Sequence, residues 1–176
     1  MGNLISALCV SLILIASFAC GRSIPVAQLP PTKPVEKVKG DILKGVFTLI
    51  GGQKVDLEAE TQPVVLIFAS DTCLTCAEET EVLVALFKDK GSLPTNVKLY
   101  TILVGAIEED AVFWREMFEV TWQVGLDPGD SLFRQYCPEG KTPCTLAYHP
   151  DNKSLVKFVG ASTPEGLQKE TGTWLY

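Results

Sequence analysis

Two cysteines separated by two residues, Cys73 and Cys76, are the side chains of this chain best suited to chemistry. They follow an apolar run at 64–69 and precede a segment with helical periodicity, so we expect Cys73 at the N-terminus of a helix. Backbone N–H groups and the helix dipole favour a thiolate at that position. Cys76 lies one helical turn later, within reach of a disulfide. The spacing therefore predicts thiol–disulfide exchange, with Cys73 as the nucleophile and Cys76 as the resolving cysteine.

A second pair of cysteines, Cys137 and Cys144, brackets a short loop that contains Thr142 and Pro143. A disulfide between them would make this loop rigid, and we favour this structural interpretation of the pair. Two alternatives stay open. The pair can be a second redox centre that relays electrons to or from the first pair, or its members can be free buried thiols.

Other roles for the cysteines are weaker on chemical grounds. A structural disulfide between Cys73 and Cys76 closes too small a loop to constrain the unfolded chain much. A zinc site would need Cys137 and Cys144 as a second ligand pair, and their separation is not the usual one. We expect no metal and no cofactor. The single histidine, His149, is expected at a surface turn beyond the active edge, so no Ser-His-Asp triad is predicted.

The segments that must position these residues alternate between strand and helix patterns. The run at 64–69 is continuous and apolar, as expected of a central strand covered on both faces. The order of the elements predicts a single domain with a mixed α/β layer architecture. We expect strands at 45–50, 54–57, 64–69, 97–104, 123–126, 145–148 and 155–160, and helices from about Cys76 to Gly91, at 108–120, at 130–136 and at 164–171.

The helix expected at 108–120 carries an apolar stripe. Val112, Phe113, Met117 and Val120 recur at helical spacing, and we expect this stripe to face the core. The three tryptophans are also expected to be packing residues: Trp114, Trp122 and Trp174.

Several short segments together resemble the TlpA/ResA-type thioredoxin-like proteins. They are Phe47-Thr48-Leu49 with Gly52, Val55-Asp56-Leu57, the apolar run 65–68 before the cysteine pair, Asp127-Pro128-Gly129, Thr142-Pro143 and Gly160. The resemblance covers roughly residues 42–171. It implies an α/β thioredoxin fold, with a central mixed β-sheet flanked by helices and an N-terminal β-hairpin extension. We place this domain at residues 41–176.

The resemblance also implies a function and a substrate contact. In that family the proline that matches Pro143 is cis, faces the active-site disulfide and, with the preceding residue, presents backbone to the substrate peptide. We carry this role to Thr142 and Pro143, because X–Pro is the bond that adopts cis at low cost. The implied activity is thiol–disulfide exchange with protein substrates in the bacterial cell envelope, through Cys73 and Cys76. Cytochrome c maturation is one process that the family serves.

The sequence departs from the thioredoxin pattern where a buried acid would accept a proton from the second cysteine. The position of that acid in the preceding strand is occupied by Ile67. The nearest carboxyl groups along the chain are those of Asp71, Glu78 and Glu79. We expect each of these three to be a solvated surface charge.

The first part of the chain has the features of an export signal. Residues 1–19 are largely apolar and read as a signal peptide, and Ser17 and Ala19 are the small residues that a signal peptidase requires before Cys20. Cys20 is the candidate lipidation site, and the proline-rich segment 20–40 is expected to be a lipid-anchored linker without strand periodicity. We therefore expect a periplasmic domain anchored in the membrane. An uncleaved anchor, a wrong start codon and an N-terminal myristoylation signal are the alternatives.

The charge balance limits the possible partners. The 176 residues carry 15 Lys and Arg against 21 Asp and Glu, a net charge of -6, so nothing draws the surface to nucleic acid or to anionic lipid. We expect a monomer whose partners are protein thiols and disulfides. Two rival functions use the same fold: a copper-binding assembly chaperone, and a redox-inactive module that binds a peptide near Pro143.

Overall fold

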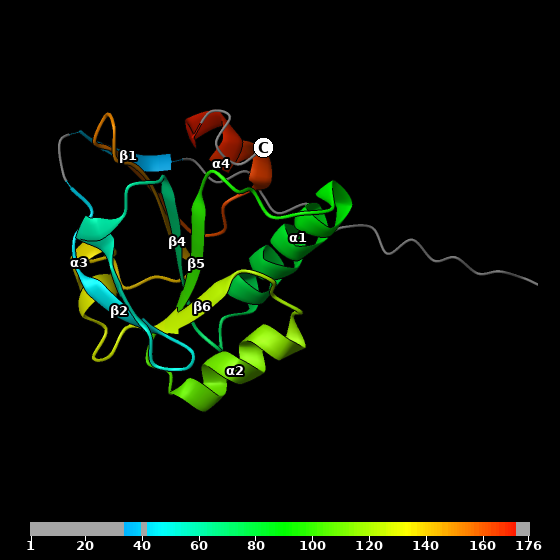
Figure 1. The fold of residues 1–176 in the computed structure, drawn as a ribbon. Helices are drawn as coiled ribbons and strands as arrows, with labels where there is room; N and C mark the ends of the chain where they lie inside the picture. Colours follow the sequence, from blue (N-terminus) through cyan, green and yellow to red (C-terminus); the bar gives the residue numbers. More distant parts are fainter. Residues whose placement is uncertain (1–33, 40–41, 172–176) are drawn as a thin grey trace, which may run out of the picture.

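In residues 34–39 and 42–171, which the computed structural model describes, eight strands form one sheet in the order β1-β8-β7-β4-β5-β6-β2-β3 (Figure 1). The strands are β1 (Pro34–Lys39), β2 (Val46–Leu49), β3 (Lys54–Asp56), β4 (Val64–Ala69), β5 (Lys98–Leu103), β6 (Gln123–Leu126), β7 (Cys144–His149) and β8 (Ser154–Val159). The helices are α1 (Leu74–Lys90), α2 (Glu108–Met117), α3 (Ser131–Tyr136) and α4 (Pro164–Thr171), with a 3-10 helix at Leu57–Ala59.

Strand β4 lies in the middle of the sheet and leads to the cysteine pair. All six of its residues are buried, as the continuous apolar run predicted. It runs parallel to β5 and antiparallel to β7, with Phe68 opposite Cys144. The carboxyl end of β4 and the start of β7 therefore meet at one edge of the sheet.

Helices cover both faces of the sheet. Because side chains alternate along a strand, Val65 and Ile67 of β4 join one core cluster, and Leu66 and Phe68 join another on the opposite face. The first core includes residues of α1, α2 and α4, and the second includes residues of α3. Figure 1 shows the same division, with α1 and α2 on one side of the sheet and α3 on the other. The predicted thioredoxin fold with its mixed central sheet is confirmed.

Local sequence signals account for the hairpin formed by β2 and β3 and for the C-terminal end of α1. Strands β2 and β3 pair antiparallel as predicted, with Phe47 opposite Val55. Gly91 is the C-cap residue of helix α1 and adopts the left-handed conformation with φ 74°. Lys88 and Lys90 lie in its last turn, where cations interact favourably with the helix dipole.

The structure corrects the expectation that no strand forms within the segment 20–40. Pro34–Lys39 is strand β1, which pairs antiparallel with β8. Without β1, strand β8 would be a sheet edge with unpaired N–H and C=O groups. Pro34 is compatible with this strand, because a proline is tolerated as the first residue of an edge strand. The predicted signal peptide at 1–19, the lipidation site Cys20 and the other linker residues up to 33 lie outside the described residues.

The apolar stripe predicted for α2 is wrong for Phe113 and Met117, whereas Val120, which follows the helix, is buried as predicted. Phe113 is 64% exposed and Met117 49% exposed, whereas Ala111 and Trp114 are buried. The indole of Trp114 packs against the ring of Phe118 with ring centroids 4.5 Å apart, and burial of this large ring turns the helix away from the predicted face. Trp122 is also buried, as expected, and Trp174 lies outside the described residues.

Within the described ranges, none of the helices combines the length and the hydrophobicity that a membrane span requires.

Candidate active site

The cysteine pair lies where β4 passes into α1. Cys73 and Cys76 form a disulfide with their Cα atoms 5.2 Å apart. Cys73 is the N-cap residue of α1 and is partly exposed, whereas Cys76 is 1% exposed. A substrate sulfur can therefore approach Cys73 and not Cys76. The roles of Cys73 as nucleophile and Cys76 as resolving cysteine stay predictions.

The helix start provides the electrostatic setting that a reactive thiol needs. The Cys73 Sγ atom accepts a hydrogen bond from the backbone N–H of Cys76 at 3.1 Å. Helix α1 has 17 residues, and the positive end of its dipole lies at this sulfur. Both effects favour the thiolate when the disulfide is open.

The Thr142–Pro143 peptide bond is cis, as the resemblance implied. Pro143 is buried and Thr142 is partly exposed. Cys144 follows directly as the first residue of β7, and the Pro143 carbonyl accepts a hydrogen bond from Gly160 N at 2.9 Å. Because β7 begins where β4 ends, this loop lies at the edge of the sheet that carries Cys73. His149 ends β7 and therefore lies at the opposite edge.

The second pair of cysteines also forms a disulfide. Cys137 and Cys144 have Cα atoms 6.5 Å apart and are 1% and 0% exposed. Both belong to the core on the α3 face of the sheet, whereas Cys76 belongs to the core on the α1 face. The sheet thus separates the two disulfides.

An ion pair also fastens the loop between Cys137 and Cys144. The Lys157 ammonium of β8 binds the Glu139 carboxylate at 2.8 Å, although the side chain of Lys157 is only 9% exposed. The hydrogen bond from Lys157 lowers the pKa of Glu139. The loop that carries Pro143 is therefore attached to the sheet by a disulfide and by a partly buried ion pair.

The structure corrects the expectation that Glu79 is a solvated surface charge. It is 1% exposed, one helical turn after Cys76 on the inward face of α1. Its Oε1 atom accepts hydrogen bonds from the Ser162 N–H at 2.9 Å, from the Ser162 hydroxyl and from the Thr145 hydroxyl at 3.5 Å. Its Oε2 atom is buried and accepts no hydrogen bond from the described part of the chain. Asp71, by contrast, is exposed as expected.

Burial changes the acidity of this carboxyl group. Loss of hydration raises the pKa of Glu79 from 4.5 to about 7, although the hydrogen bonds from Ser162 and Thr145 act in the opposite direction. Glu79 can therefore take up and release a proton near neutral pH. The spacing in the sequence indicates only that this carboxyl group shares a helix face with Cys76, and not that this face is buried.

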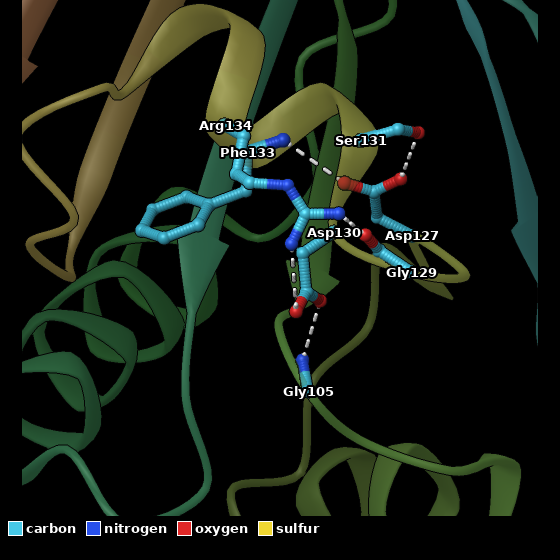
Figure 2. A network of polar contacts seen from close by, with 7 residues as sticks. All are labelled: Gly105, Asp127, Gly129, Asp130, Ser131, Phe133 and Arg134. Carbon is cyan, nitrogen blue, oxygen red and sulfur yellow. Dashed lines mark hydrogen bonds and ion pairs between the residues drawn. The ribbon is translucent and has the colours of Figure 1, made fainter.

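A polar network holds the start of α3 (Figure 2). The buried carboxylate of Asp127 accepts hydrogen bonds from the Ser131 hydroxyl at 3.0 Å and from Phe133 N at 2.9 Å. Asp130 accepts a hydrogen bond from Gly105 N at 2.8 Å, which ties the loop after β5 to α3. Arg134 pairs with Asp130 and donates to the Gly129 carbonyl. Because Cys137 is the C-cap residue of α3, this network sets the position of the second disulfide.

Comparison with known proteins shows the fold. No profile of a known protein family matches the sequence, and no curated protein matches it. Among solved structures, the chain is similar to a secreted Mycobacterium tuberculosis disulfide oxidoreductase homologous to E. coli DsbE, with a TM-score of 0.58 and 17% identity over 74% of this chain and 93% of that chain.

Two further structures show the same likeness. StoA from Bacillus subtilis matches with a TM-score of 0.58 and 18% identity over 80% of this chain and 99% of that chain. A DsbF homologue from Corynebacterium diphtheriae matches with a TM-score of 0.61 and 17% identity over 76% of this chain and 89% of that chain. At these identities the likeness establishes a shared thioredoxin-like fold.

Proposed function

We propose that this protein is a thiol–disulfide oxidoreductase that exchanges disulfides with protein substrates through Cys73 and Cys76. The observation that carries the proposal is the asymmetry of the pair: an accessible Cys73 at the start of α1 is bonded to a buried Cys76. A carboxyl group that titrates near neutral pH, that of Glu79, lies one helical turn farther on. The solved structures with the same fold include a disulfide oxidoreductase, which supports the assignment.

The exchange proceeds in two displacements when the protein acts as reductant. The Cys73 thiolate attacks one sulfur of the substrate disulfide, a mixed disulfide forms, and the other substrate sulfur leaves as a thiolate that takes up a proton. The Cys76 thiolate then attacks Cys73 Sγ, the mixed disulfide breaks, and the second substrate sulfur leaves and is protonated. Two electrons pass to the substrate, and the protein is left with the Cys73–Cys76 disulfide. The same steps in reverse oxidise a substrate dithiol.

We assign to Glu79 the role of proton acceptor for Cys76. The Cys76 thiol is buried and cannot lose its proton directly to water. Glu79 follows Cys76 by three residues on the same buried face of α1, and a base with a pKa of about 7 is well matched to the task at neutral pH. The proton moves from Cys76 Sγ to the Glu79 carboxylate as the thiolate attacks.

The substrate peptide is proposed to bind beside the Thr142–Pro143 bond. The partly exposed Thr142 lies at the edge of the sheet that carries Cys73, and an extended peptide there can use backbone hydrogen bonds. The Cys137–Cys144 disulfide is proposed to be structural. Its sulfurs are buried on the other face of the sheet, which argues against a direct relay of electrons to Cys76.

We further propose that the protein acts in the bacterial cell envelope, exported by residues 1–19 and anchored through a lipid on Cys20. Two disulfides in one small domain fit an oxidising compartment. Mass spectrometry of the protein purified from a bacterial membrane fraction tests this part. The predicted result is an N-terminal Cys20 that carries acyl chains, and an unmodified N-terminus at Met1 would contradict it.

A Cys76→Ser variant tests the enzymatic proposal, because it can form the mixed disulfide and cannot resolve it. We expect envelope proteins to be trapped on Cys73 and released by a reductant. A matched Cys73→Ser variant should trap far less, since Cys76 is buried. Equal trapping by both variants would contradict the asymmetry of the pair on which the proposal rests. No trapping by either variant would contradict the proposal itself and leave a copper-binding or redox-inactive protein as the remaining interpretation.

A further inference from the structure

Ser162 lies in the segment between β8 and α4, 83 residues after Glu79 in the sequence. Its side chain is 0% exposed. Both its backbone N–H and its hydroxyl donate to the same oxygen, Oε1 of Glu79. Two donors from one residue therefore hold one end of the buried carboxyl group, and the other oxygen, Oε2, is left without a hydrogen bond from the described residues.

We propose that Ser162 is a positioning residue that controls how readily Glu79 accepts the proton of Cys76, and so sets the pH range in which the mixed disulfide is resolved. This inference rests on the proposed function. Ser162 touches neither cysteine in the hydrogen bonds of the described residues, and it acts through Glu79 alone.

The direction of the effect follows from the chemistry of the donors. A hydroxyl and an amide N–H stabilise a carboxylate more than a carboxylic acid, so they favour the ionised form that can accept a proton. Burial favours the neutral form. The two hydrogen bonds from Ser162 lower the pKa of Glu79 and burial raises it by more, which leaves a pKa of about 7. Ser162 thus keeps an otherwise neutral acid available as a base.

The surroundings of Glu79 leave few other groups that can set its charge. Strand β7 contributes the hydroxyl of Thr145. Helix α4, which packs against α1, contributes the buried apolar Leu167 to the core on the α1 face of the sheet. On α1 itself the titratable neighbour on the same face is Cys76. Among the described residues, burial and the three hydrogen bonds account for the pKa of Glu79, and no charged side chain contributes.

The variant Ser162→Ala removes the hydroxyl and keeps the backbone N–H. Loss of one hydrogen bond to a charged acceptor corresponds to about a tenfold change in proton affinity. At pH 7 the ionised fraction of Glu79 should then fall from about one half to about one tenth. We therefore expect resolution of the mixed disulfide to slow about fivefold at pH 7, and the midpoint of its pH profile to move upward.

The assay uses the purified full chain with its Cys73–Cys76 disulfide reduced, and dithiobis(nitrobenzoate) as the probe. Cys9 and Cys20 are replaced by serine in every protein compared, because their thiols would also react with the reagent. Attack by Cys73 releases one coloured thiolate and forms a mixed disulfide with the other half of the reagent. Attack by Cys76 then releases the second thiolate, and the slow phase of colour reports on Cys76. Its rate is measured as a function of pH for the wild type and Ser162→Ala.

Two controls separate positioning from structural damage. Thr163→Ala removes the hydroxyl that accepts from Gly166 N at 3.0 Å, which weakens the start of α4 next to Ser162 without touching Glu79. It should leave the pH profile unchanged. In a Glu79→Gln background, Ser162→Ala should have no further effect on the profile, because its target no longer titrates.

The outcomes distinguish this inference from the function on which it rests. An upward shift that is specific to Ser162→Ala and vanishes with Glu79→Gln supports it. Three results would overturn the proposed role of Ser162 and leave the exchange activity in place. They are an unchanged pH profile in Ser162→Ala, an equal shift in Thr163→Ala, and a shift that persists in the Glu79→Gln background. If the wild type itself shows no second phase, the proposed function fails as well.

Discussion

The buried carboxyl group of Glu79 should make the stability of this protein depend on pH in an unusual direction. Most carboxyl groups in folded proteins have a lowered pKa and stabilise the fold as pH rises. The pKa of Glu79 is instead raised from 4.5 to about 7. Between these values the native protein binds a proton that the unfolded chain releases, so stability is lost as pH rises. The contribution is fully present below pH 4.5 and fully lost above pH 7.

The size of the effect follows from the same values. A tenfold change in proton affinity corresponds to about 1.4 kcal/mol. The rise in the pKa of Glu79 from 4.5 to about 7 therefore makes the native state about 3 kcal/mol less stable well above pH 7 than well below pH 4.5, through this group alone. For a domain of this size that is a substantial part of the free energy of unfolding.

Denaturant unfolding of the wild type and of Glu79→Gln, with both disulfides intact, measures this quantity. Glutamine has nearly the same shape and does not titrate, so contributions of the other groups cancel in the difference between the two proteins. That difference should change by about 3 kcal/mol across the interval, with the wild type losing stability relative to the variant as pH rises. A difference that stays constant with pH, or that changes with the opposite sign, would refute the burial argument.

Three further predictions follow from the positions of the disulfides and of Asp127. Under limiting reductant, Cys73 and Cys76 should become free thiols first while Cys137 and Cys144 stay bonded, because the second pair is buried. Alkylation followed by peptide mapping checks this order, and simultaneous labelling of both pairs would contradict it. Replacing Cys137 and Cys144 together by serine should lower the free energy of unfolding by about 2 to 3 kcal/mol while Cys73 and Cys76 still exchange disulfides, whereas loss of exchange in a folded variant would favour an electron relay. Asp127→Ala should cost about 2 to 3 kcal/mol in denaturant unfolding, since Ser131 and Phe133 lose their carboxylate acceptor, and Asp127→Asn should cost less because it keeps one acceptor oxygen; equal costs would contradict this and show that a neutral acceptor contributes nothing there.

Much of the fold could be predicted because its signals are local. Strands β4 and β6 and helix α4 have the predicted bounds, since each is a clear run flanked by proline, glycine or polar residues. The facing of α2 could not be predicted from periodicity. Two apolar faces compete on that helix, and the choice between Phe113 and Trp114 depends on which ring fits the tertiary core.

Within the candidate site, the cysteine pair could be predicted from the sequence, whereas the buried environment of Glu79 could not. Cys73 and Cys76 could be found because their spacing and their place before a helix are local features. The environment of Glu79 could not, because a carboxyl group stays buried only when distant residues supply hydrogen bonds. Those donors, Ser162 and Thr145, follow it by 83 and 66 residues. Strand β1 was missed for a related reason, since it forms by pairing with an edge that the sequence around 34–39 does not reveal.

The reduction potential of the Cys73–Cys76 disulfide tests the central claim most directly. The purified chain is equilibrated in glutathione buffers of graded ratio, quenched with an alkylating agent and digested, and the free cysteines are located and counted by mass spectrometry. Exchange activity predicts a potential between about -270 and -120 mV for this pair, the range of known thiol exchangers. A potential below about -300 mV would show a structural disulfide and contradict the proposed function.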